Sequence, residues 1–180
     1  MSPIAHALAT IVAALLVWGA VTDVRVARIP NRLIVAGLVL AALAALAAGG
    51  VMGLGLALAA LIFAFLIGFG GFAIGAIGGG DAKFLMVGAA LVGWQQMVPY
   101  LLATAALGAV LAVGVIVWQR RGIEATVMTA DLAKSMMTLG RKGHRGRLGD
   151  EGRLAVPYGV AIAAGALIVR FTPFAEWLLG

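Results

Sequence analysis

Two aspartates, Asp23 and Asp81, are the residues of this sequence best suited to chemistry. The chain has seven acidic residues, and only these two lie at the junctions of long apolar segments. A carboxylate close to hydrocarbon is costly, so such a residue usually has a functional or a paired role. Two carboxyl groups brought together in a low-dielectric setting do not both ionise easily, and the pair then shares one proton. One group can act as a base on water while the other polarises a carbonyl, which is the chemistry of an aspartic protease.

Each aspartate also has a simpler interpretation. Asp23 ends an apolar segment, where the helix dipole disfavours an anionic side chain, and it could form an ion pair with Arg25 or Arg28 at the lipid headgroups. Asp81 follows three glycines, residues 78–80, and could simply cap a helix. Those glycines would also let a substrate backbone approach closely, because they carry no side chain. The residues alone leave both alternatives open.

The composition excludes several other kinds of site. The chain has no cysteine, which excludes disulfides, thiolate metal sites and a cysteine nucleophile. His6 and His144 lie far apart without ligand-like spacing, so we expect no metal site and no cofactor. The net charge of +6 could suit nucleic acid. We expect no nucleic-acid partner, because in so apolar a chain the basic residues orient the protein in a membrane.

The apolar content predicts an all-α, polytopic membrane helical bundle. Hydrophobic residues make up 63% of the 180 residues and charged residues 11%, with a mean hydropathy of +1.11. A soluble domain carries about a quarter charged residues. In a bilayer only helices and closed barrels satisfy their backbone groups, and long unbroken runs rich in Ala, Leu and Gly favour helices. At about 20 residues per crossing, we predict about six transmembrane helices, at approximately 4–22, 33–48, 54–77, 82–94, 97–118 and 154–171.

The basic residues predict the orientation of the chain. Of the 13 Lys and Arg, three lie between the first two spans, Lys83 follows the third span, and eight lie between the fifth and sixth. With six spans these connections share one side, which is the cytoplasmic side because basic loops stay there. Both termini would then lie outside, and Asp23 and Asp81 would share the cytoplasmic edge. Arg170 is the exception, and we expect it to reach the outer interface.

Residues 119–153 form the one sizeable polar stretch, a predicted cytoplasmic basic loop. Apolar residues recur in its first part at helical spacing, which predicts a short amphipathic helix on the inner leaflet. The Gly-rich, basic part that follows could attract anionic lipid headgroups. We see no second soluble domain, so a single membrane-embedded domain is predicted over residues 1–180.

Three motifs resemble those of the type IV prepilin leader peptidases, which belong to the GxGD intramembrane aspartyl proteases. Residues 23–31 (DVRVARIPN) resemble the first motif, in which an aspartate after the first span is followed by a basic segment and an Ile-Pro-Asn entry to the second span. Residues 78–83 (GGGDAK) resemble the GxGDxK motif, and residues 156–161 (VPYGVA) resemble the Pro-(Tyr/Phe)-Gly segment that opens the last helix. The motifs follow the family's order along the chain.

The resemblance implies an endopeptidase that cuts the basic leader from type IV prepilins at the cytoplasmic face of the bacterial inner membrane. It implies that Asp23 and Asp81 are the catalytic pair. Its implied partners are the prepilin, with its leader and hydrophobic helix, and components of pilus assembly. The resemblance also implies residues that orient the second aspartate, support the structure or line the substrate. They are Gly78, Gly80, Lys83, Pro30, Asn31, Pro157, Tyr158 and Gly159.

One departure from the family pattern is informative. Longer members carry an N-terminal cytoplasmic region with cysteine pairs, which is linked to N-methylation of the trimmed pilin. This sequence has no cysteine and begins directly in the first span. We therefore expect the short, peptidase-only form that serves tight-adherence (Flp) pili, without a methyltransferase region. Two alternatives stay open: a non-catalytic membrane subunit of a pilus or secretion platform, and a small transporter that uses buried carboxylates.

Overall fold

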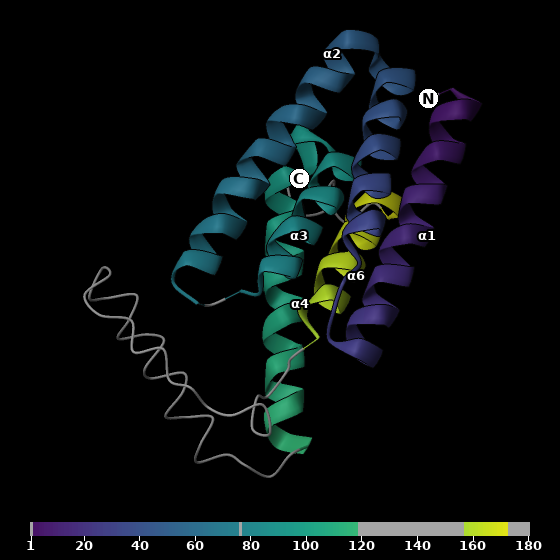
Figure 1. The fold of residues 1–180 in the computed structure, drawn as a ribbon. Helices are drawn as coiled ribbons and strands as arrows, with labels where there is room; N and C mark the ends of the chain where they lie inside the picture. The colour runs from purple at the N-terminus through teal and green to yellow at the C-terminus, as the bar shows by residue number, and fades with distance from the viewer. Residues whose placement is uncertain (1, 76, 119–156, 173–180) are drawn as a thin grey trace.

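The computed structural model describes residues 2–75, 77–118 and 157–172, which form a bundle of helices (Figure 1). These residues contain no strand, so the all-α prediction is confirmed for them. The predicted amphipathic helix within 119–153 lies outside the described residues. The elements are α1 (Pro3–Val26), α2 (Asn31–Ala73), α3 (Gly79–Val92), the 3-10 helix η1 (Trp94–Gln96), α4 (Met97–Trp118) and α6 (Tyr158–Phe171).

Three segments are helical, long and apolar enough to cross a membrane, which indicates a membrane protein. They are Pro3–Val26, Asn31–Ala73 and Trp94–Val115. Helices α3 and α6 have 14 residues each, fewer than the about 20 that a crossing takes. The count of six spans and the outside placement of both termini therefore stay predictions.

Helix α2 is interrupted at Gly49 and Gly50, where the backbone leaves the helical conformation. Gly50 has a φ of 61°, which side-chain-bearing residues rarely adopt. The chain turns at this point, at the top of Figure 1, and the second arm of α2 runs back toward the other end of the bundle. The turn lies where the sequence predicts the boundary between the second and third spans, just after residue 48.

Helix α3 packs against α1, α2 and α6, and its side chains form much of the core. Phe84 and Val87 of α3 are fully buried. The Phe84 ring lies directly on the backbone of α1, because a Cβ at Gly19 would come within 2.6 Å of the ring. Gly37 of α2 accommodates Val87 in the same way, because a Cβ at Gly37 would lie 2.7 Å from Val87 Cγ1. Close approach over small residues is how helices associate where lipid removes the hydrophobic driving force.

Candidate functional site

Asp23 lies in the last turn of α1, and Asp81 lies in the first turn of α3. These two helix ends lie at the same end of the bundle, the one that faces downward in Figure 1. Helix α1 ends there, and α3 and α6 begin there. The contact between Gly19 and Phe84 sets their register, because Asp23 lies one helical turn beyond Gly19 and Asp81 lies three residues before Phe84. The negative charge of Asp23 acts electrostatically on Asp81. Two carboxyl groups from distant parts of the chain thus share one site.

The Asp23 carboxylate is held by the first turn of α6. The backbone N–H of Gly159 donates a hydrogen bond to Asp23 Oδ2 at 2.9 Å. The first N–H groups of a helix have no partner within the helix, and the helix dipole is positive at this end. This contact offsets the unfavourable position of Asp23 near the C-terminal end of α1. Asp23 takes this backbone partner, whereas Arg25 and Arg28, the alternative partners, have exposed side chains.

Asp81 is the third residue of α3 and not its N-cap. The helix begins at Gly79 and is capped by Gly78. The backbone N–H of Gly78 donates a hydrogen bond to the Asp81 carboxylate. In a capping box, the side chain of the third helical residue accepts the same hydrogen bond from the N-cap residue. Asp81 lies outside the three candidate spans, and burial, followed by the charge of Asp23, raises the pKa of its carboxyl to about 6. The carboxyl of Asp81 therefore binds a proton more readily than an ordinary aspartate does.

Tyr158 joins the site from the first turn of α6. Its ring packs on the backbone of α4, because a Cβ at Gly108 would come within 2.6 to 2.8 Å of the ring and hydroxyl atoms. The charge of Asp81 acts on the Tyr158 hydroxyl, and Pro157 is the N-cap of the helix. The segment 157–159 thus adjoins both aspartates, through Gly159 at Asp23 and Tyr158 near Asp81.

Other residues singled out in the sequence lie at this end without joining the pair. The side chains of Pro30, Asn31 and Lys83 are exposed. Pro30 caps α2, and its carbonyl accepts hydrogen bonds from the first turn of that helix. Within the described part of the chain, no hydrogen bond links these three residues to either aspartate. Burial and Asp23, and not Lys83, cause the shift at Asp81.

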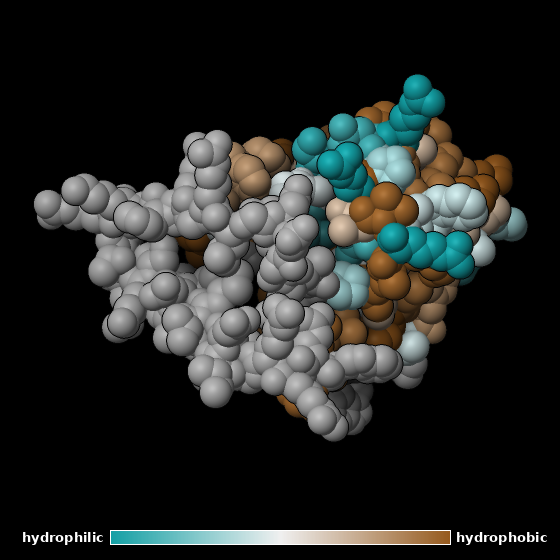
Figure 2. Space-filling model, turned by 60° about the horizontal axis from the view of Figure 1, so that its bottom comes forward, coloured by the Kyte–Doolittle hydropathy of each residue, from teal (hydrophilic) through white to brown (hydrophobic). Residues whose placement is uncertain are grey.

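The aspartate end of the bundle carries a cluster of basic side chains. Arg25, Arg28, Arg32 and Lys83 are exposed there. In Figure 2, which brings this end forward, hydrophilic side chains gather on one part of the face and hydrophobic ones flank them. Among the residues that the structure describes, no three His, Asp or Glu side chains gather in a way that could hold a metal ion. The site is therefore a pair of carboxyl groups beside a basic surface.

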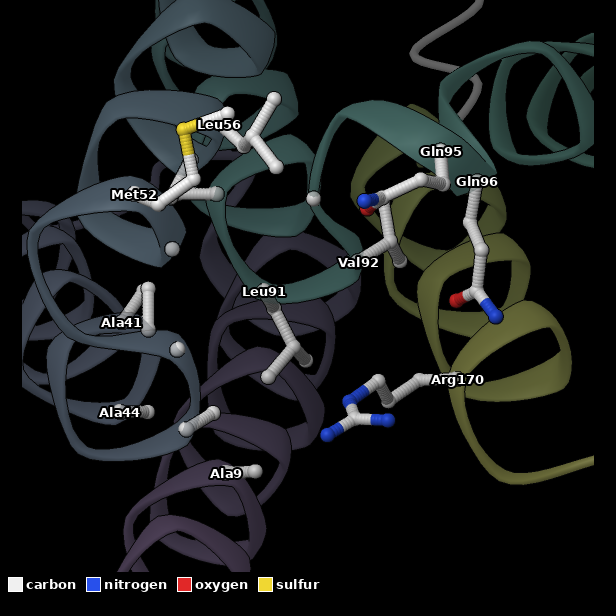
Figure 3. Close-up of a pocket in the computed structure, with 17 residues that line it drawn as sticks. Ala9, Ala41, Ala44, Met52, Leu56, Leu91, Val92, Gln95, Gln96 and Arg170 are labelled. Atoms are coloured by element: carbon white, nitrogen blue, oxygen red, sulfur yellow. The ribbon is translucent and has the colours of Figure 1, made fainter. Parts of the chain in front are cut away.

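A cavity of about 410 Å³ lies at the opposite end of the bundle. Helices α1, α2, α3, η1 and α6 line it, mostly with alanine and glycine (Figure 3). The side chain of Arg170 points into this cavity, below the amide of Gln96 in the view. The sequence predicts that Arg170 reaches the outer interface, and the structure places it half-buried at the end away from the aspartates.

Comparison with known proteins identifies the family. The sequence profile of the type IV leader peptidase family matches residues 10–113. The match covers more than half of the chain and contains both aspartates, whereas residues 157–159 lie beyond it. Searches of curated proteins and of solved structures found no match. A match that runs from α1 into α4 and includes both carboxyl groups of the site shows that the chain belongs to the type IV leader peptidase family, a family of proteases.

Proposed function

We propose that this protein is an intramembrane aspartyl endopeptidase that removes the basic leader from type IV prepilins of the Flp type. The proposed place of cleavage is the cytoplasmic face of the bacterial inner membrane. The observation that carries the proposal is the meeting of Asp23 and Asp81 at one end of the bundle, within a chain of the leader peptidase family. We assign these two residues as the catalytic pair, with residues 157–159 as positioning residues.

The reaction needs one ionised and one protonated carboxyl group. We assign Asp23 as the base, because its carboxylate is held in place by the hydrogen bond that the backbone N–H of Gly159 donates to it. Asp81 holds the shared proton, because burial and the charge of Asp23 favour its neutral form. Asp23 takes a proton from a water molecule, whose oxygen attacks the scissile carbonyl carbon. Asp81 gives its proton to the carbonyl oxygen at the same time.

The intermediate then collapses and restores the pair. Asp81 recovers its proton from a hydroxyl of the intermediate, the C–N bond breaks, and the departing nitrogen takes the proton held by Asp23. The products are a carboxyl end on the leader and a free amine on the mature pilin. The scissile bond must be unwound to react, since a helical peptide bond is shielded by its own hydrogen bonds.

Co-expression with leader-bearing substrates tests the proposal. A panel of Flp prepilins, other type IV prepilins and preflagellins is expressed with and without this protein. We expect the Flp prepilin to be shortened, as seen by gel mobility, with a new N-terminus immediately before its hydrophobic helix. If the protein inserts into the membrane and no member of the panel is shortened, the proposal is wrong, and the role of a non-catalytic membrane subunit takes its place.

The glycines before Asp81 are expected to differ in their tolerance of a side chain. A Cβ at Gly78 would lie 2.9 Å from Asp81 Oδ2, whereas a Cβ at Gly80 would meet nothing within 4 Å. Because misplacing a catalytic group by 1 Å can cost about 10²-fold, we expect Gly78→Ala to slow cleavage by about tenfold or more. Gly80→Ala is its matched control and should stay within about twofold of wild type. Equal rates for the two variants, measured on one prepilin, would show that Gly78 does not position Asp81.

Cleavage is expected to fall as the pH rises above about 6. The pKa of Asp81 near 6 marks the loss of the shared proton from the free protein. Below this pH the proton is present, and above it both carboxyls ionise, so the active fraction falls about tenfold per pH unit. The measurement is kcat/KM for a soluble prepilin peptide between about pH 4.5 and 8.5, since this quantity reports the free enzyme. A kcat/KM that keeps rising from pH 6 to 8.5 would contradict the assignment of Asp81 as the proton donor.

A further inference from the structure

An apolar groove between α1 and α6 leads to the aspartate site. It has a volume of about 460 Å³ and is lined by these two helices. The lining residues run from Val17 to Arg25 on α1 and from Val160 to Leu167 on α6. On each helix the apolar ones recur at spacings of three and four positions, which places them on one helix face. The groove is therefore formed by two facing helix surfaces.

Alanines form the floor of this groove. Ala20 and Ala163 are buried, and Ala164 is half-buried beside them. The valines of α1 stand at its edge, with Val21 42% and Val24 59% exposed. Two helices that present small residues between larger ones let the backbone of a third helix approach closely. The surface thus suits an apolar helix better than it suits a globular partner.

The groove ends at the proposed catalytic pair. Val24 and Val160 line this end, and their chain neighbours Asp23 and Gly159 share the 2.9 Å hydrogen bond. Arg25, the charged residue of the lining, also lies at this end. The groove is apolar along its length and charged where the aspartates begin. That polarity matches a helix that leaves the hydrocarbon and enters the headgroup region beside the site.

We propose that this groove holds the first turns of the substrate's hydrophobic helix and directs its leader end to Asp23. The inference rests on the proposed function and adds the place where the substrate binds. The lining of α1 from Val17 to Val24 covers about 10 Å of helix at 1.5 Å per residue, or about two turns. Recognition is thus confined to the start of the substrate helix, and the remainder lies against lipid.

Site-specific crosslinking tests the groove directly. The chain has no cysteine, so an introduced cysteine is unique. Ala164→Cys places a thiol in the groove, and Ala36→Cys, at an exposed position of α2, is the matched control. Each is combined with Asp81→Asn, which keeps the substrate intact, and with a prepilin that carries one cysteine in the first two turns of its hydrophobic helix. We expect a crosslinked enzyme–prepilin product from Ala164→Cys, at least about tenfold more abundant than from Ala36→Cys.

Two outcomes of this experiment would overturn the inference. Crosslinking between two copies of the enzyme at Ala164→Cys, undiminished by the prepilin, would mean that a second copy fills the groove. Equal or absent enzyme–prepilin crosslinking at both positions would mean that the substrate helix does not occupy the groove.

A cleavage assay separates this inference from the proposed function. Ala164→Leu fills part of the groove, so we expect cleavage of a full prepilin to slow by about tenfold, while Ala36→Leu stays within about twofold of wild type. If Ala164→Leu cleaves as fast as wild type while Asp23→Asn is inactive, the groove is not the binding site and the proposed function stands. If the wild-type protein cleaves no prepilin, the proposed function itself fails.

Discussion

Replacing either Asp23 or Asp81 with asparagine is expected to abolish leader removal. Asparagine has nearly the shape of aspartate, but it cannot take a proton from water or give one to the scissile carbonyl. General acid–base groups contribute about 10²- to 10⁴-fold to a rate, so each variant should lose at least that much turnover. The measurement is the mobility shift of a co-expressed prepilin, followed by initial rates with purified protein in vesicles.

The asparagine variants should remain folded, and this distinguishes a chemical defect from a structural one. The pKa of Asp81 rises from 3.8 to about 6 on folding. Between these two pH values, the folded state therefore binds more protons than the unfolded state. The stability of wild type therefore falls as the pH rises through that range and stays lower above it. At pH 7 the Asp81→Asn variant, with no carboxylate to bury, should melt at or above the wild-type temperature.

The double variant gives a further control on the same assignment. Residues that act as a unit are strongly non-additive, so Asp23→Asn and Asp81→Asn together should lose little more than either alone. Normal cleavage by one of the single variants, at wild-type abundance in the membrane, would remove that residue from the catalytic pair.

Gly159→Ala is expected to have the largest effect of any substitution outside the pair, about 10²-fold on cleavage. A Cβ at this position would lie 2.8 Å from Asp23 Oδ2 and 3.1 Å from Asp23 Cβ. The whole Asp23 side chain must then move, and the hydrogen bond from the α6 N-terminus changes with it. A displacement of about 1 Å at a catalytic group is worth about 10²-fold in rate. The expected change is in kcat, measured with purified protein across prepilin concentrations.

A second glycine provides the matched control for Gly159→Ala. Gly114 lies in α4, and a Cβ there would meet nothing within 4 Å. Gly114→Ala should keep the wild-type rate, and the helix propensity of alanine should stabilise the protein by up to about 1 kcal/mol. Equal rates for Gly159→Ala and Gly114→Ala would show that the first turn of α6 does not position Asp23.

The shared end of the two aspartates could be predicted from the sequence, by combining the predicted span boundaries with the positions of the basic residues. Basic residues follow Asp23 and Asp81, and basic loops stay on one side of a membrane. The structure places both residues at one end of the bundle, where the exposed basic side chains also lie. The break at Gly49 and Gly50 was equally predictable, because adjacent glycines ended an apolar run.

The partners of the two carboxyl groups could not be predicted in this way. Whether Asp81 caps α3 or lies inside it depends on how far the helix extends into three glycines, which have weak helical preference. The hydrogen bond from Gly159 to Asp23 joins residues 136 positions apart. It depends on the register of α6 against α1, which no local pattern encodes. The groove depends on the same register, because each helix supplies only one face of it.

The number of membrane crossings depends on more than apolar length. The predicted spans at 82–94 and 154–171 correspond to α3 and α6, and each of these helices has 14 residues. Helix α3 is nevertheless mostly buried by its neighbours, with Phe84 and Val87 fully enclosed. A short helix surrounded by other helices need not match the bilayer thickness, because protein rather than lipid covers its ends.

A cysteine pair tests the central claim, the meeting of Asp23 and Asp81, most directly. In this cysteine-free chain, a short thiol crosslinker should join the cysteines of the double variant Asp23→Cys with Asp81→Cys. Neither thiol should then react with a maleimide label. Ser2→Cys with Asp81→Cys should stay unlinked, because the 24 residues of α1 separate the ends of the bundle by about 36 Å. The positive control is Ser2→Cys with Ala47→Cys, at positions joined by a 3.0 Å hydrogen bond. If the control pair links and the pair at 23 and 81 keeps both thiols free, the two aspartates do not share one site.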